Sequence, residues 1–313
     1  MKVAIIGAGA IGGYFAARIA RSGHDVRLFA RGANGETIRA RGLEVREAGG
    51  SWIERLETTD DIAALGDPDL ALLAVKSYSL EGILPVCRRL AERGATILPL
   101  LNGVDTFESL VAGGVPAERV LPGLTAISVE KTGPGAVARW SDFWIVAVGE
   151  RDGSVSERAA AADRLFRDAG AESHVSSDIE ADLWRKFLFL AALAAACGLA
   201  RAPVGQVLAA PLGPALIARA VGEIAAVARA RGVALAVDEE KSVLARIQGL
   251  APALKPSFLV DLEHGGPTEL DALSGAVSRY GVKLGIPTPI HDTVVAAVGA
   301  FLGSGAPAAP ASR

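Results

Sequence analysis

One lysine lies in a strongly apolar stretch, where an ammonium group needs a partner or a cleft. Lys186 follows Asp182-Leu183-Trp184-Arg185 and precedes the apolar run 187–200. Burying an unpaired ammonium group is costly, and burial lowers its pKa toward working pH. Such a lysine can donate a proton to a carbonyl oxygen as hydride arrives at the carbon. The alternative is a lysine near the start of a helix that extends its charged end into solvent.

A serine and a glutamate farther along the chain are the next polar candidates. Ser257 precedes Glu269 by twelve residues, and a break at Gly265-Gly266-Pro267 separates two predicted helices. Glu269 lies in the first turn of the second helix, where the helix dipole favours a carboxylate. From spacing alone, a capping charge is therefore as good an interpretation of Glu269 as a role in chemistry.

The chain opens on a glycine-rich turn between an apolar strand, residues 3–6, and a helical run, residues 14–20. A diphosphate reaches helix N–H groups only where no side chain blocks it. The first glycine permits the turn, the second admits the pyrophosphate, and the third lets the helix pack on the strand. This context favours a dinucleotide site over a merely structural turn. Its expected residues are Gly7, Gly9, Ala10, Ile11 and Gly12.

The end of the next predicted strand, residues 24–30, indicates which dinucleotide binds. An NAD site usually has Asp or Glu there, facing the adenosine ribose. This chain has Phe29-Ala30-Arg31-Gly32 instead, and a guanidinium group pairs with a 2′-phosphate. The expected cofactor is therefore NADP(H). The alternative for Arg31 is an ordinary solvated loop arginine.

Two further polar residues follow predicted parallel strands. Lys76 comes after the strand at 70–75, and Asn102 comes after the strand at 96–101. Ligands of open parallel sheets bind beyond the carboxyl ends of the strands. Both side chains are therefore expected to face the nicotinamide half of the cofactor, although either could be an idle loop residue.

The apolar pattern predicts an α/β fold in two domains. Residues 1–177 should form a Rossmann-type, doubly wound sheet that binds NADP. Further strands are expected at 120–129, 136–139, 144–148 and 172–175, with helices at 84–92 and 157–168. Residues 178–302, rich in Ala and Leu with helical spacing, should form an all-helical substrate domain. Residues 303–313, rich in Gly, Ala, Pro and Ser, are expected to be a flexible tail.

Composition narrows the class of partner. The chain has 313 residues, a formal net charge of −3 and no run of Lys or Arg, so a small molecule fits better than nucleic acid. The first residues lead directly into a core strand, which favours a cytoplasmic protein without a signal peptide. Cys87 and Cys197 lie in no metal or redox spacing, and the histidines are scattered, so no metal site is expected.

The longest apolar run, residues 187–200, falls short of the roughly 20 residues that span a bilayer. We expect a buried helix rather than a membrane helix. Packing in the core is the default for the apolar helices of the second domain, and a homodimer interface is the alternative.

Five motifs occur together along the chain: GAGAIGG at the start, Val75-Lys76, Leu101-Asn102-Gly103, Leu183-Trp184-Arg185-Lys186 and Thr268-Glu269-Leu270-Asp271. With them the chain, to about residue 302, resembles the ketopantoate reductase (2-dehydropantoate 2-reductase) family. The resemblance implies a two-domain enzyme that transfers hydride from NADPH to the keto carbon of a branched 2-oxo acid. That reaction is a step in pantothenate biosynthesis.

The resemblance also implies a role for each candidate. Lys186 matches the general acid, Glu269 the carboxylate that binds the reacting oxygen and orients the lysine, and Ser257 the hydroxyl that meets the substrate. Asn102 and Lys76 match a pair on the cofactor side, and Arg31 matches the contact to the 2′-phosphate.

The chain departs from the family pattern on one helical face. The family helix typically has asparagines four and eight residues after the lysine, where this chain has Leu190 and Ala194. Two polar contacts of roughly 0.5–1.5 kcal/mol each would be lost. Ketopantoate is the expected substrate, and a 2-oxo acid with a more apolar side chain is the alternative. A non-catalytic NADPH-binding regulator is the alternative from a different class. The joint presence of Lys186, Glu269, Ser257 and Asn102 argues against it, because a regulator needs none of them.

Overall fold

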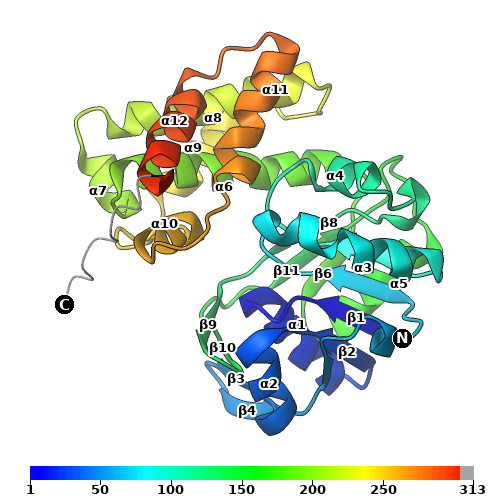
Figure 1. The fold of residues 1–313 in the computed structure, drawn as a ribbon. Helices are drawn as coiled ribbons and strands as arrows, with labels where there is room; N and C mark the ends of the chain where they lie inside the picture. The colour runs from blue at the N-terminus through cyan, green and yellow to red at the C-terminus, as the bar shows by residue number, and fades with distance from the viewer. Residues whose placement is uncertain (304–313) are drawn as a thin grey trace. The chain divides into compact units, whose positions relative to one another are not determined.

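The computed structural model describes residues 1–303, so residues 304–313 of the predicted tail lie outside the described residues. The chain divides into two compact units. The first comprises Met1–Leu101 and Thr106–Ile179, and the second comprises Asn102–Asp105 and the chain from Glu180 onward. The first unit is α/β and the second is helical (Figure 1), so the predicted fold class is confirmed.

A five-stranded parallel sheet in the order β5-β2-β1-β6-β7 forms the first unit's centre. Strands β6 and β7 are buried along their whole length, as expected where helices cover both faces. Helix α1 connects β1 to β2, and α3 connects β6 to β7. The bounds are β1 (Lys2–Ile6), α1 (Ala10–Arg21), β2 (Asp25–Phe29), α2 (Gly32–Arg41), β5 (Glu57–Thr59), β6 (Leu70–Leu73), α3 (Leu80–Glu92), β7 (Thr96–Pro99) and α4 (Thr106–Ala112).

Two smaller sheets complete this unit, in the orders β4-β3-β10-β9 and β12-β11-β8. Their elements are β3 (Leu43–Glu47), β4 (Gly50–Glu54), β8 (Gly123–Ala126), β9 (Val129–Gly133), β10 (Ala136–Arg139), β11 (Ile145–Val148), α5 (Glu157–Asp168) and β12 (Glu172–Val175). The single strand expected at 120–129 is wrong, because β8 and β9 belong to different sheets. Residues 127 and 128 separate them. The Ser128 carbonyl oxygen accepts from Trp140 N–H, and Ser128 N–H donates to Ser141 Oγ.

Aromatic packing holds α1 on the core of the first unit. The ring of Phe15 lies 4.9 Å from that of Trp144 and 5.9 Å from that of Phe166, between centroids. Tyr14 is buried and donates a hydrogen bond to the Glu47 carboxylate, which also pairs with Arg18 at 3.6 Å. The glycine turn therefore precedes a helix that is fixed along its length.

The second unit packs its helices around one hydrophobic core. By length and composition α6 could cross a membrane, but 61% of its most apolar window is buried, as expected for a core helix. It extends beyond the predicted 187–200 at its start. The helices are α6 (Ile179–Ala200), α7 (Val204–Ala209), α8 (Gly213–Ala230), α9 (Glu239–Gln248), α10 (Ser257–Glu263), a π-helical turn (Asp271–Gly275), α11 (Ala276–Leu284) and α12 (Pro289–Gly303).

A fully buried histidine joins three elements of this unit. His291 on α12 lies 3.1 Å from Ser274 Oγ in the π-helical turn and 3.2 Å from the carbonyl oxygen of Ala220 on α8. Because a carbonyl oxygen only accepts, Nε2 carries the proton and Nδ1 accepts from the serine hydroxyl. Burial lowers the pKa of His291 from 6.5 to about 4, so the ring is neutral in the folded protein.

This neutral ring should make the stability of the protein sensitive to acid. The folded-state pKa lies below the unfolded value, so the stabilisation is complete above pH 6.5 and is lost as the pH falls toward 4. Relative to His291→Gln, the wild-type protein should lose about 2 kcal/mol more between pH 7 and pH 5. Urea unfolding at both pH values measures this difference, and equal losses in the two proteins would contradict the assignment.

Candidate active site

Three of the predicted side chains meet within the helical unit. Lys186 Nζ donates a hydrogen bond to Asn102 Oδ1 at 3.2 Å, and Asn102 Nδ2 donates to Glu269 Oε2 at 3.1 Å. The amide therefore gives its acceptor to an ammonium group and its donor to a carboxylate. A cation, an amide and an anion form one hydrogen-bonded chain, called the Lys-Asn-Glu chain below.

Lys186 owes its unusual acidity to the helix that carries it. On α6 its neighbours Trp184 and Phe187 are buried, and their rings meet edge to face at 5.6 Å between centroids. Burial lowers the pKa of Lys186 from 10.5 to about 8, and the charge of Glu269 acts in the opposite direction. The ammonium group can therefore give up a proton within reach of neutral pH.

Glu269 is the anionic end of the Lys-Asn-Glu chain. It is 3% exposed and lies just before the π-helical turn, in which Gly275 N–H bonds to Leu270 O at 2.9 Å. A carboxylate this deeply buried needs hydrogen-bond partners, and Asn102 supplies one. Glu269 is therefore a buried, hydrogen-bonded carboxylate, and the choice between a role in chemistry and a capping charge stays a prediction.

Ser257 is the exposed first residue of α10 and takes no part in the Lys-Asn-Glu chain. Its neighbour Phe258 packs against α6, since a Cβ at Gly198 would lie 2.4 Å from Phe258 Cε1. The helices α10 and α6 therefore approach closely.

The face of α6 that carries Lys186 continues as hydrocarbon. Leu190, Ala194 and Gly198 follow Lys186 at intervals of four residues, so they share its face. Leu190 is partly buried, whereas Ala194 is only 1% exposed and belongs to the core. The first position beyond the lysine on this face is therefore an aliphatic side chain.

The glycine turn of the first unit has the geometry that a dinucleotide requires. Gly7 has a φ of +108°, and a Cβ at Gly12 would lie 1.9 Å from Gly7 O. These two glycines are required by the fold itself. The first hydrogen bond into α1 runs from Gly13 N–H to Gly9 O, so the N–H groups of Ala10, Ile11 and Gly12 have no acceptor within the helix.

Gly9 differs from the other two glycines of the turn. Its φ is −73°, and the nearest atom to a Cβ built there is 3.9 Å away. Neither strain nor crowding by the protein demands glycine at this position. Open space beside the N-terminus of α1 fits the approach of a pyrophosphate, so the residues present fit a dinucleotide.

Arg31 is exposed and occupies the N-cap position of α2. Its guanidinium carbon lies 5.9 Å from the Phe29 ring centroid. The first turn of α2 contains no acidic residue. The end of β2 therefore presents a cation and helix N–H groups, which suits a phosphate better than a ribose hydroxyl.

Asn34 is a residue that the sequence analysis missed. Its Nδ2 donates to Ala8 O at 2.7 Å, and its Oδ1 accepts from Gly135 N–H at 2.8 Å. Because C=O and N–H point in opposite directions across a trans peptide, holding the Ala8 carbonyl also orients the Gly9 N–H. An amide in the first turn of the helix after β2 was the available signal, but its partners are 26 and 101 residues away.

Lys76 is partly buried, at the start of the single 3₁₀ turn Ser77–Ser79 that follows β6. The strand ends at Leu73, two residues before the predicted end. Lys76 belongs to the first unit, whereas Asn102 belongs to the second. Their expected pairing on the cofactor side therefore stays a prediction.

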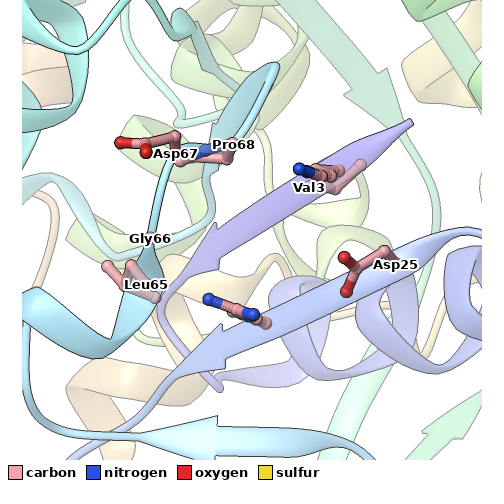
Figure 2. A pocket seen from close by; sticks show the side chains of 8 residues that line it. Val3, Asp25, Leu65, Gly66, Asp67 and Pro68 are labelled. Carbon is pink, nitrogen blue, oxygen red and sulfur yellow. The ribbon is translucent and has the colours of Figure 1, made fainter.

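A pocket of about 250 Å³ lies elsewhere in the first unit, at the amino ends of β1 and β2. Figure 2 shows side chains that line it. Lys2, Asp25, Arg27 and Asp67 line it. Arg27 pairs with Glu57 and Asp67 with Arg93. A parallel sheet binds its ligand at the carboxyl ends of the strands, so this cavity is not part of the candidate site.

Comparison with known proteins identifies the family of the chain. Residues 3–152 match the model of the ketopantoate reductase PanE/ApbA family, and residues 178–301 match the model of its C-terminal region. The uncharacterized oxidoreductase YkpB of Bacillus subtilis is 31% identical to the chain, covering 95% of this chain and 97% of its own.

Two solved structures are similar over almost the whole chain. A PanE/ApbA family ketopantoate reductase from Ralstonia eutropha has a TM-score of 0.89 at 29% identity, covering 97% of this chain and 99% of its own. D-mandelate dehydrogenase in complex with NADH and anilino(oxo)acetate has a TM-score of 0.86 at 26% identity, with the same coverage. The chain belongs to the ketopantoate reductase family and is an oxidoreductase of that family.

Proposed function

We propose that this protein reduces a 2-oxo acid to the corresponding 2-hydroxy acid with NADPH, and that ketopantoate is its substrate. The observation that carries the proposal is the Lys-Asn-Glu chain, in which a lysine of lowered pKa is hydrogen bonded to Asn102. The family membership supports the reaction class.

The residues of the helical unit supply the proton and the electrostatics. When bound, the nicotinamide supplies the hydride that reduces the keto carbon. Lys186 Nζ donates a proton to the keto oxygen as negative charge develops there. Glu269 holds Asn102, and Asn102 holds the ammonium group, so the donor is oriented before the substrate arrives. Ser257 is proposed to contact the substrate.

The residues of the first unit hold the cofactor in this proposal. The N–H groups of Ala10, Ile11 and Gly12 receive the pyrophosphate beside Gly9, and Arg31 pairs with the 2′-phosphate. We assign Lys76 to the same cofactor. The structure of D-mandelate dehydrogenase contains NADH, so the binding of NADPH and of NADH must both be measured.

A second candidate substrate is a 2-oxo acid with an apolar or aromatic side chain. The observation that favours it is the hydrocarbon character of the α6 face, with Leu190 one turn beyond Lys186. The structural similarity to D-mandelate dehydrogenase supports the same alternative. A protein that binds NADPH but reduces no 2-oxo acid would instead be a regulator.

Removal of the proposed proton donor tests the reaction. Lys186→Ala should lower kcat about 10²- to 10⁴-fold, because the alkoxide would have to take its proton from water. The wild-type rate should fall above about pH 8, where Lys186 loses its proton. Stopped-flow oxidation of NADPH from pH 6 to 10 measures both. Lys241→Ala, an exposed lysine on α9, is the matched control, and near-normal turnover of Lys186→Ala would refute the assignment.

Replacement of Arg31 tests the choice of cofactor. Arg31→Ala should raise the KM for NADPH about 10- to 100-fold, because a charged hydrogen bond to phosphate is lost, while the KM for NADH stays the same. Arg39→Ala on the same helix, which removes an exposed pair with Asp60, should change neither value. An unchanged preference in Arg31→Ala would assign Arg31 to solvent.

Replacement of Leu190 tests which 2-oxo acid the protein prefers as substrate. Leu190→Asn should raise kcat/KM for ketopantoate about 10-fold relative to phenylglyoxylate, since an amide would replace hydrocarbon beside the substrate. Leu190→Met keeps the apolar volume and should leave this ratio unchanged. If the asparagine variant also leaves it unchanged, Leu190 does not contact the substrate.

A further inference from the structure

The segment that carries Asn102 is short and joined at both ends to the first unit. Residues Asn102–Asp105 group with the helical unit, although the chain before and after them belongs to the α/β unit. Gly103 has a φ of +113°, and a Cβ there would lie 3.4 Å from Ala272 O. Val104 is buried in the helical core. One apolar side chain and a close backbone approach therefore hold this segment in place.

An arginine on α11 connects the same segment to the residues that follow Glu269. Arg279 Nη2 donates to Asp105 Oδ2 at 2.9 Å, and Arg279 Nη1 donates to Asp271 Oδ1. Asp105 lies three residues after Asn102, and Asp271 lies two residues after Glu269. One rigid guanidinium group thus binds a carboxylate from each of the two segments that supply the site.

The two ion pairs of Arg279 differ in exposure. The side chain of Arg279 is 48% exposed, and those of Asp271 and Asp105 are 88% and 25% exposed. Both pairs share the half-exposed guanidinium group, so solvent screens them and they contribute little to folding. Their geometry is nevertheless specific, because different nitrogens bind carboxylates that lie far apart in the sequence. If Arg279 fixes the position of one segment relative to the other, both the small contribution to folding and the specific geometry are explained.

We propose that Arg279 is a positioning residue, which keeps the Asn102 segment in register with Glu269 and so preserves the Lys-Asn-Glu chain. This proposal rests on the proposed function of that chain. If the ion pairs of Arg279 with Asp105 and Asp271 are broken, Asn102 should lose its hydrogen bonds to Lys186 and Glu269 for part of the time.

The direction of the change in Lys186 separates positioning from a simple effect of charge. Removing a nearby cation raises the pKa of a lysine, because repulsion of its charged form is relieved. Losing the Asn102 acceptor lowers that pKa, because the charged form loses a hydrogen bond. Positioning therefore predicts a downward shift when Arg279 is replaced.

The test compares Arg279→Met with the wild-type protein in two measurements. In the first, kcat for 2-oxo acid reduction should fall about 10- to 100-fold from misplacement of the donor, with the dissociation constant for NADPH unchanged. The alkaline fall in rate should move to lower pH by about half a unit. In the second, the Lys186 Cε resonance, identified by its absence in Lys186→Arg, is titrated by NMR without substrate and should move in the same direction.

Control variants show whether the effect is specific to Arg279. Arg229→Met breaks a two-nitrogen pair with Glu240 elsewhere in the helical unit, at 41% exposure, and should leave rate and titration unchanged. Asp105→Asn and Asp271→Asn each weaken one of the two ion pairs and should reproduce part of the fall in kcat. Because removal of an anion itself lowers the pKa of a lysine, their titrations do not decide the question. Arg279→Gln, which also removes the cation, replaces Arg279→Met if that variant does not fold.

An unchanged or upward shift of the Lys186 titration in Arg279→Met would overturn the positioning role. If the wild-type protein reduces no 2-oxo acid, the proposed function fails, but the titration without substrate still decides the role of Arg279.

Discussion

A cationic side chain within an apolar helix sets the requirements that the rest of the site must meet. Lys186 cannot be both charged and buried without a hydrogen-bond acceptor and a counter-charge. Asn102 supplies the first and Glu269 supplies the second. Because Asn102 comes from a loop and Glu269 from the residues just before the π-helical turn, the helical unit must bring three distant segments together to keep one proton available near neutral pH.

The two units divide the proposed chemistry between them. The α/β unit contains the glycine turn, where open space beside Gly9 and unpaired N–H groups suit a pyrophosphate. The helical unit contains Lys186, the proposed proton donor. Asn34 and Arg279 have comparable places in the two halves. Asn34 bonds to the backbone of two segments that lie far apart in the sequence, and Arg279 bonds to carboxylates of two such segments. Neither touches the reacting atoms in the proposed scheme.

The sequence could predict features that depend on local pattern. The strand-turn-helix at the start, the helical second unit and a lysine with unusual surroundings all follow from spacing and composition. The position of Glu269 could not be predicted, because a first-turn carboxylate is as often a cap, and only its contact with Asn102 identifies it as buried and bonded. The Ser128 backbone between β8 and β9 bonds to Ser141, and Asn34 bonds to Gly135. Such contacts between distant residues leave no periodic signal.

The chain passes between the two units at 101/102, at 105/106 and at 179/180. The helical unit is therefore not one continuous stretch of sequence. A fragment beginning at Glu180 would keep Lys186 and Glu269. It would lack Asn102, whose amide lies between them, and Val104, which fills part of the core of the helical unit. For the same reason, a chimera that joins the N-terminal part of one family member to the helical part of another would take residues 102–105 from the first protein and the helices from the second. Recombination within this fold must therefore preserve the match between residues 102–105 and the helices that receive them, which ties the evolution of the two halves together.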